Sequence, residues 1–168
     1  MSLARVQSEM TLPPFQSLLD AHGREVHRFL SGIVGPVDAD DCYQDTWIAA
    51  LRAYPRLRDA SNLRGWLLTI AHRKAIDAIR DRRRAAVPVE EIPESSSPED
   101  AGRVAALDDG EVWGLVRRLP DKQRTAIALR YLLDADYALI SDVMATSEEA
   151  ARRNVHEALK RLRKEYLP

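Results

Sequence analysis

The residues with the clearest chemical potential lie in the segment "GWLLTIAHRKAIDAIRDRRR", Gly65–Arg84, where basic and apolar side chains are interleaved. The apolar positions recur at helical spacing and indicate one buried stripe: Leu68, Ala71, Ala75, Ile76 and Ile79. The basic side chains point elsewhere on the same helix: Arg73, Lys74, Arg80 and Arg84. Positive charge in this arrangement suits phosphate binding, although a basic amphipathic helix taken alone is more often an ordinary solvated face.

A second basic segment, "DYALISDVMATSEEAARRNVHEALKRLRK", predicts a helix-turn-helix. A short helix is expected to end at a turn around Ala145-Thr146, and Ser147 is placed to cap the second helix. Apolar residues at helical spacing are expected to pack the two helices together: Leu139, Ile140, Val143, Ala151, Val155 and Leu159. The second helix would then present its exposed residues to a DNA major groove: Arg152, Arg153, His156 and Glu157.

The sequence offers no comparable set of catalytic residues. The histidines are scattered, at His22, His27, His72 and His156, and none pairs convincingly with Cys42 as a nucleophile with its base. The acids Asp38, Asp40 and Asp41 suit helix capping better than a metal site. We therefore expect a protein that is not an enzyme and has no cofactor or metal. Cys42 fits a helix core better than a redox sensor.

The chain as a whole is nearly neutral, but its charge is unevenly distributed. Residues 1–86 carry 13 Lys and Arg against 10 Asp and Glu, residues 87–112 carry one Arg against eight acids, and residues 113–168 carry 11 basic against eight acidic residues. The acidic stretch includes "VPVEEIPESSSPEDAG", whose prolines and serines predict an exposed, flexible linker. No apolar run has the length of a membrane span and no secretion signal is evident, so a cytoplasmic protein is expected.

The elements that must position the basic segments are predicted to be helices throughout, so the expected fold class is all-α. A first helix is expected to end around Gly32, Gly35 and Pro36, and a second, capped by Asp38 or Asp40, to run until Pro55. On the second helix, one side is expected to hold Tyr43, Trp47, Leu51 and Tyr54, and another Asp41, Asp45, Ile48 and Arg52. A loop, "PRLRDASN", then precedes the Gly65–Arg84 helix.

Three ordered motifs together resemble the extracytoplasmic-function (ECF) group of bacterial sigma-70 family factors. These motifs are "DADDCYQDTWIAALRAYPRL", "LRGWLLTIAHRKAIDAIRDRRR" and "LPDKQRTAIALRYLLDADYALISDVMATSEEAARRNVHEALKRLRK". The resemblance extends from about Phe15 to Lys164. It implies sigma region two at 12–86, an acidic linker at 87–110 and sigma region four at 111–168. The implied function is to bind core RNA polymerase, direct it to promoters through the −10 and −35 elements and promote DNA melting.

The resemblance also implies roles for individual residues. The helix before the loop would dock on the β′ subunit of core RNA polymerase through Asp41, Gln44, Asp45 and Ile48. The −10 element would be bound as unpaired bases and phosphates by Arg58, Ser61, Asn62, Arg64, Trp66, Arg73, Lys74, Arg80 and Arg84. The −35 duplex would be read by Ser147, Arg152, Arg153, His156 and Glu157. The implied partners are the β and β′ subunits of the polymerase, duplex and single-stranded promoter DNA and, as a further candidate, an anti-sigma factor.

Some positions depart from the family pattern, and other functions stay open. Ala145 stands in the turn where glycine is common, so the turn is expected to adopt a conformation that alanine tolerates. Glu157 occupies a position that is frequently basic, which leaves the −35 sequence undetermined. The main alternative is a two-domain regulator that binds duplex DNA without joining the polymerase. A protein-binding helical adaptor is a third possibility, and it predicts no salt-sensitive DNA affinity.

Overall fold

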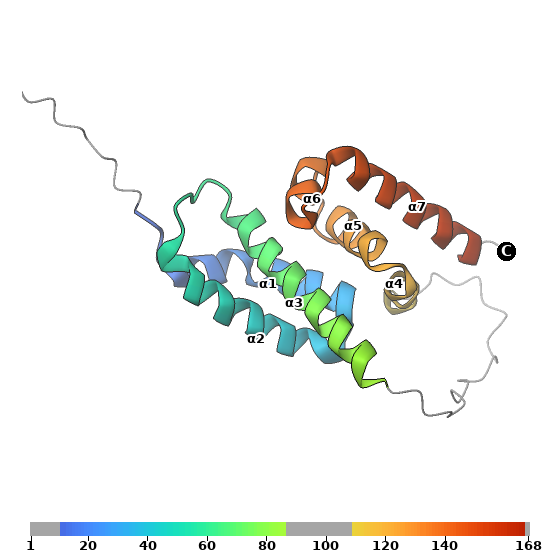
Figure 1. Cartoon of the computed structure of the whole chain (residues 1–168), viewed down its shortest axis with the longest axis horizontal. Coiled ribbons are helices and arrows are strands. Elements are labelled where there is room, and N and C mark those ends of the chain that lie inside the picture. Colours follow the sequence, from blue (N-terminus) through green and yellow to red (C-terminus); the bar gives the residue numbers. More distant parts are fainter. Residues whose placement is uncertain (1–10, 87–108, 167–168) are drawn as a thin grey trace, which may run out of the picture.

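The computed structural model describes residues 11–86 and 109–166 (Figure 1). These residues form seven α-helices and one 3₁₀ turn, and no strand occurs among them. In chain order the elements are α1 (Phe15–Val34), α2 (Pro36–Ala53), the 3₁₀ turn η1 (Tyr54–Arg56), α3 (Leu63–Ala85), α4 (Asp109–Arg118), α5 (Asp121–Leu132), α6 (Tyr137–Met144) and α7 (Glu148–Tyr166). The all-α prediction is confirmed. Residues 87–108, most of the predicted linker, lie outside the described residues.

Helices α1, α2 and α3 form the first bundle. Its core is closed by side chains that have no measurable exposure, including Phe29, Leu30 and Ile33 of α1 and Leu67 of α3. An aromatic cluster closes the end near the 3₁₀ turn, where Phe15 packs edge-on against Trp47 and Tyr54. Leu51 follows Trp47 by one helical turn on the same side of α2, as predicted, but it is 55% exposed and does not join this cluster.

The turn between α1 and α2 differs from the prediction. The second helix begins at Pro36, directly after Gly35, and neither Asp38 nor Asp40 caps it. Gly35 has a φ of +84°, which only glycine adopts readily, and Pro36 then fixes the first helical φ. Gly32 lies inside α1 instead of ending it. The glycine–proline pair therefore sets the sharp reversal that lays α2 against α1.

The second bundle contains α4 to α7, with the predicted helix-turn-helix formed by α6 and α7. Asp136 caps α6 through the Leu139 amide at 2.8 Å, and Ser147 accepts the Ala150 amide at 3.1 Å, as the sequence predicted for the second helix. Between the helices, Ala145 has a φ of +50°. Ala145 therefore adopts the left-handed conformation, which alanine accepts here at a cost that glycine would not have.

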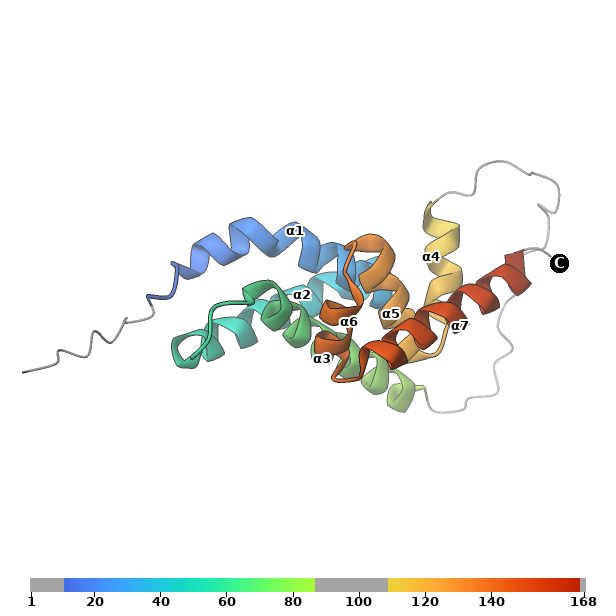
Figure 2. The same ribbon diagram turned by 90° about the horizontal axis from the view of Figure 1, so that it is seen from above.

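The two bundles pack against each other in this structure. Helix α3 contacts α6, and α1 contacts both α4 and α5 (Figure 2). In the view of Figure 1, α3 lies between α2 and the helix-turn-helix. The basic helix and the helix-turn-helix are therefore neighbours in space, although their sequences are separated by the linker.

Candidate nucleic-acid interface

The basic residues of α3 differ in their surroundings: some are exposed to solvent, and others lie close to acidic side chains. Arg73 and Arg80 are exposed, as expected for side chains that bind phosphate. Lys74 is half-buried and lines a hollow between α2 and α3 together with Asp41, Asp45, Asp77 and other acids. Arg84 is exposed, 3.8 Å from Asp81 on the same helix. The structure therefore places Lys74 away from Arg80, among carboxylates that compete with phosphate.

The loop before α3 is held by its own polar side chains. The Ser61 amide donates to Asp59 at 2.8 Å, and hydrogen bonding to Ser61 is the main cause that lowers the pKa of the Asp59 carboxyl. Asn62 caps α3 by accepting the Gly65 amide at 2.9 Å. Arg58 and Ser61 stay exposed. Asn62, which was predicted to contact bases, therefore serves as the N-cap of α3 in this structure.

The two residues predicted at the start of α3 are also engaged within the chain. The Arg64 Nε donates to Glu25 at 2.6 Å, and its Nη2 donates to the Leu133 carbonyl of the second bundle at 2.7 Å. Trp66 is half-buried, with its ring centroid 6.1 Å from that of Tyr54. Arg64 is therefore part of the contact between the bundles, and only part of the Trp66 ring faces solvent.

The helix-turn-helix places its predicted residues on α7 largely as expected. Arg152, Arg153 and His156 are exposed, and Glu157 is half-buried. Arg152 lies 3.4 Å from Glu148, one turn earlier on the helix. The buried side of α7 carries Ala151, Val155 and Ala158, so the basic residues must lie on the outer surface.

Arg80 and Arg153 line the same hollow between α3, α5 and α7. This hollow has a volume of about 470 Å³ and also contains Lys122, His72 and Thr146. Residues predicted to bind the −10 element and residues predicted to read the −35 element therefore face one another. This juxtaposition could not be read from the sequence, because it depends on how the bundles dock.

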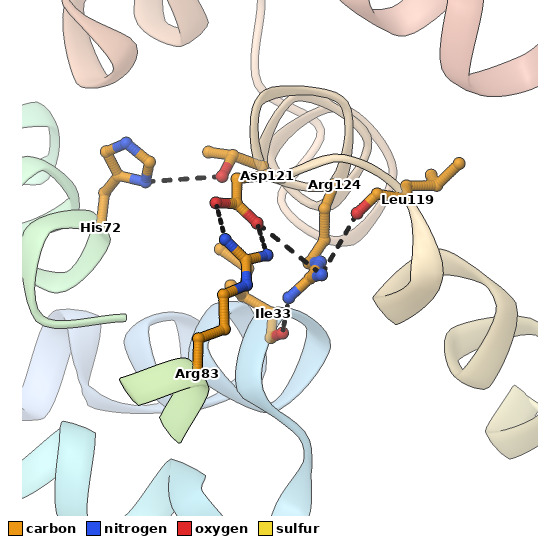
Figure 3. Close-up of polar contacts among 7 residues, drawn as sticks. Ile33, His72, Arg83, Leu119, Asp121 and Arg124 are labelled. Carbon is orange, nitrogen blue, oxygen red and sulfur yellow. Dashed lines mark hydrogen bonds and ion pairs between the residues drawn. The ribbon is translucent and has the colours of Figure 1, made fainter. Parts of the chain in front are cut away.

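A polar junction beside this hollow joins the bundles through residues that sequence reasoning did not single out (Figure 3). Arg83 of α3 donates two hydrogen bonds to Asp121 of α5, at 2.8 and 3.0 Å. Arg124 of α5 donates to the Ile33 carbonyl at the end of α1, at 3.3 Å, and to the Leu119 carbonyl at 3.2 Å. Burial lowers the pKa of the Arg124 guanidinium. The two-bond pair of Arg83 with Asp121 and the positive charge of Arg124 at the C-terminus of α1 both stabilise the docked arrangement.

His72 lies at the same contact. Its Nδ1 is 3.5 Å from the Thr125 hydroxyl, and burial is the main cause that lowers its pKa to about 4. The nearby Arg73 lowers this pKa further, while Asp121 opposes the shift. His72 is therefore neutral near pH 7 in the docked arrangement.

Helix α2 carries an exposed surface of mixed character. The predicted docking residues Asp41, Gln44 and Asp45 are exposed, and Ile48 is 48% exposed. The structure adds Val37, 84% exposed, and Leu51 to this surface. Val37 and Leu51 continue the predicted stripe of Asp41, Asp45 and Ile48 at helical spacing, one before it and one after it. The sequence therefore contained the signal that would have identified both residues. An exposed apolar surface rimmed by carboxylates is typical of a protein–protein contact.

Cys42 and the acids of α2 show no features of a reactive or metal centre. Cys42 is buried, and burial together with the charges of Asp38, Asp45 and Asp41 raises the pKa of its thiol. The core assignment of Cys42 is confirmed. Among the described residues, no group of three or more His, Cys, Asp or Glu side chains could hold a metal ion. Within the same ranges, no helix has the length and apolar character of a membrane span.

Comparison with known proteins identifies both bundles. The Sigma-70 region 2 family matches residues 18–85, and the Sigma-70, region 4 family matches residues 109–162. The chain is 32% identical over 124 residues to the ECF RNA polymerase sigma factor SigC of Mycobacterium tuberculosis, spanning 73% of this chain and 67% of SigC. It is 31% identical over 150 residues to SigD of the same species, spanning 83% of this chain and 71% of SigD.

A solved structure shares the fold. The sigma factor RpoE of Bartonella quintana, in complex with the anti-sigma factor NepR, matches with a TM-score of 0.71 at 23% identity, covering 89% of this chain and 94% of RpoE. The two family matches follow one another in the order that the sequence motifs predicted. This chain therefore belongs to the ECF group of the sigma-70 family and is an RNA polymerase sigma factor.

Proposed function

We propose that this sigma factor divides promoter recognition between its two bundles. The loop before α3 and the exposed residues of α3 bind the −10 element, and α7 reads the −35 duplex. The domains carrying these roles are residues 12–86 and 111–168, with residues 87–110 as the linker. The observation that supports this division is the presence of exposed arginines on helices of separate bundles, with Arg73 and Arg80 on α3 and Arg152 and Arg153 on α7.

Promoter binding by this chain requires its two bundles to separate. The −10 and −35 elements are centred about 25 base pairs apart, which is roughly 85 Å at 3.4 Å per base pair. Arg80 and Arg153, however, line one hollow in the docked chain. Arg64 is likewise held by the Leu133 carbonyl of the second bundle. The docked arrangement thus cannot reach both elements at once, so the contacts of Arg83 and Arg124 have to open.

The exposed surface of α2 is the proposed docking site for core RNA polymerase. Ile48 and Leu51 provide apolar area, and Asp41 and Asp45 provide charge at its edge. In this arrangement the polymerase performs the catalysis, and the chain supplies recognition without a cofactor. An anti-sigma factor is a further proposed partner, supported by the shared fold of RpoE in its complex with NepR.

Transcription reconstituted from purified components tests this function. Core RNA polymerase plus the chain is expected to start at defined sites on genomic DNA, whereas core polymerase alone is not. Asp45→Arg is expected to weaken assembly with core polymerase while the isolated chain keeps its helical content. Asp20→Arg reverses an exposed acid on α1 and serves as the matched control. Unchanged assembly of the Asp45 variant would move the docking site off this surface.

Co-purification separates the sigma factor from the alternative regulator. A regulator that binds duplex DNA alone would show salt-sensitive DNA affinity without core polymerase and would not be retained by it. The matches to both sigma-70 regions do not favour that alternative. Retention on core polymerase together with defined start sites would exclude it.

A further inference from the structure

The ring of Tyr137, the first residue of α6, is contacted by the guanidinium groups of two arginines from neighbouring helices. The guanidinium carbon of Arg152, on α7, is 4.9 Å from the centre of the Tyr137 ring. The guanidinium carbon of Arg130, on α5, is 5.2 Å from the same centre. Both distances are within the range of a cation–π contact. The ring thus links three helices of the second bundle, and one of its partners is a proposed DNA-reading residue.

The two arginines are held to different degrees. Arg130 also donates to the Ala135 carbonyl at 2.9 Å, which fixes it across the connection between α5 and α6. Arg152 has a side chain that is 58% exposed, and its only other polar contact among the described residues is Glu148 at 3.4 Å. An exposed arginine loses several freely rotating bonds when it pairs with a base, and this loss opposes binding. A ring that already restricts the side chain reduces that loss.

We propose that Tyr137 is a positioning residue for duplex readout, because its ring holds the Arg152 guanidinium ready for a base edge. The inference rests on the proposed role of α7 in reading the −35 element. Arg130 anchors the ring from the α5 side, so the orientation of Arg152 is set by the fold of the helix-turn-helix. Tyr137 itself has no need to contact DNA in this role.

The test uses holoenzyme assembled from core polymerase and the full chain, with promoter duplexes randomised at the −35 element. Tyr137→Leu removes the aromatic face and is expected to weaken preference at one base pair by about two- to five-fold, the equivalent of an exposed cation–π contact. Tyr137→Phe keeps the face and is expected to retain the preference. Tyr131→Leu, at an exposed tyrosine of α5, is the matched control and is expected to change nothing.

A double-mutant cycle with Arg152→Ala shows whether Tyr137 acts through Arg152. In the Arg152→Ala background, Tyr137→Leu is expected to have no further effect on base preference. An equal loss in both backgrounds would overturn the proposal, as would equal losses for the Leu and Phe variants. Thermal unfolding of each variant is measured as well, to detect general damage to the second bundle. Such damage would weaken binding to all sequences alike, whereas loss of positioning changes the preference at one base pair.

The cycle also distinguishes this proposal from the function on which it rests. If Arg152→Ala changes base preference but Tyr137→Leu does not, readout by α7 stands and the positioning role is wrong. If Arg152→Ala leaves base preference unchanged, Arg152 is not a reader and both statements fall.

Discussion

At the scale of single residues, Ala145 shows how the helix-turn-helix is held. The Thr146 amide donates to the Ser141 carbonyl at 3.0 Å and the Ala145 amide to the Asp142 carbonyl at 3.3 Å, which is a Schellman arrangement at the end of α6. This arrangement needs a left-handed residue, and Ala145 takes that conformation with its side chain present. Alanine at this position therefore costs stability that glycine would not.

Ala145→Gly is expected to raise the free energy of unfolding by about 1 kcal/mol, because glycine adopts the left-handed conformation without the steric cost of Cβ. Chemical denaturation of the two proteins measures the difference. Ala49→Gly, in the middle of α2, makes the same change in a helical conformation and is expected to lower the free energy of unfolding by a similar amount. A loss of stability in the Ala145 variant would mean that the turn has another conformation.

At the scale of elements, the helices were the most predictable features, whereas of the predicted caps only Ser147 is present. The stripe of Leu68, Ala71 and Ala75 and the cap of Ser147 depend on residues a few positions apart, so local spacing contains the information. The turn before α2 was mispredicted because Gly35 and Pro36 both end one helix and begin the next. The exposure of Leu51 was not predictable, because helical spacing gives the side of α2 on which a residue lies but not how far the packing extends over that side.

Helix α7 provides the prediction that belongs to a single element. Arg153 is exposed in the first turns of α7, where recognition helices reach base edges. Arg153→Ala is expected to cost about 1–3 kcal/mol at one base pair of the −35 element and to leave the other positions unchanged. Arg163→Ala, at an exposed arginine near the end of the same helix, is the control. Uniform weakening on all sequences would indicate phosphate contact instead.

At the scale of the whole molecule, the docking of the two bundles could not be predicted. Arg83 and Asp121 are 38 positions apart, and Arg124 and Ile33 are 91 apart. The sequence predicted α3 as a DNA-binding helix, and its own pattern does not indicate that Arg64 and Arg83 would contact the other bundle. Such contacts follow from surface fit between complete bundles, which leaves no periodic pattern in the chain.

A substitution at Gly32 tests the docking of the two bundles without removing a charged residue. A Cβ atom at Gly32 would lie 2.6 Å from a Leu132 methyl and 3.4 Å from the Trp113 ring, so Leu132 would have to move away from α1. Gly32→Ala is expected to favour helix α1 itself and to weaken the contact between the bundles. Hydrogen exchange should then speed up at the contact but not in the core of the first bundle. Gly114→Ala, with no atom within 4 Å of the added Cβ, is the control and should leave exchange at the contact unchanged.

His72, which is half-buried at the contact between the bundles, makes the folded, docked chain sensitive to pH. Its pKa of about 4 lies below the ordinary value of 6.5, so the unfolded state binds more protons between these values. This contribution to stability is present above pH 6.5 and is lost as the pH falls toward 4. At pH 5 the loss is at most about 2 kcal/mol. His72→Gln is expected to reduce the difference in unfolding free energy between pH 7.5 and pH 5, as measured by denaturation. An unchanged difference would contradict the lowered pKa of His72.

The distance between the bundles tests the central claim, that the docked chain cannot span both promoter elements and has to separate its bundles to bind them together. Spin labels at Asp20 of α1 and Lys160 of α7, both exposed, report this distance in a Cys42→Ser background. In the free chain we predict a single short distance. In holoenzyme bound to a promoter we predict an increase of tens of ångströms, consistent with elements roughly 85 Å apart. The same short distance in free chain and promoter complex would contradict the claim.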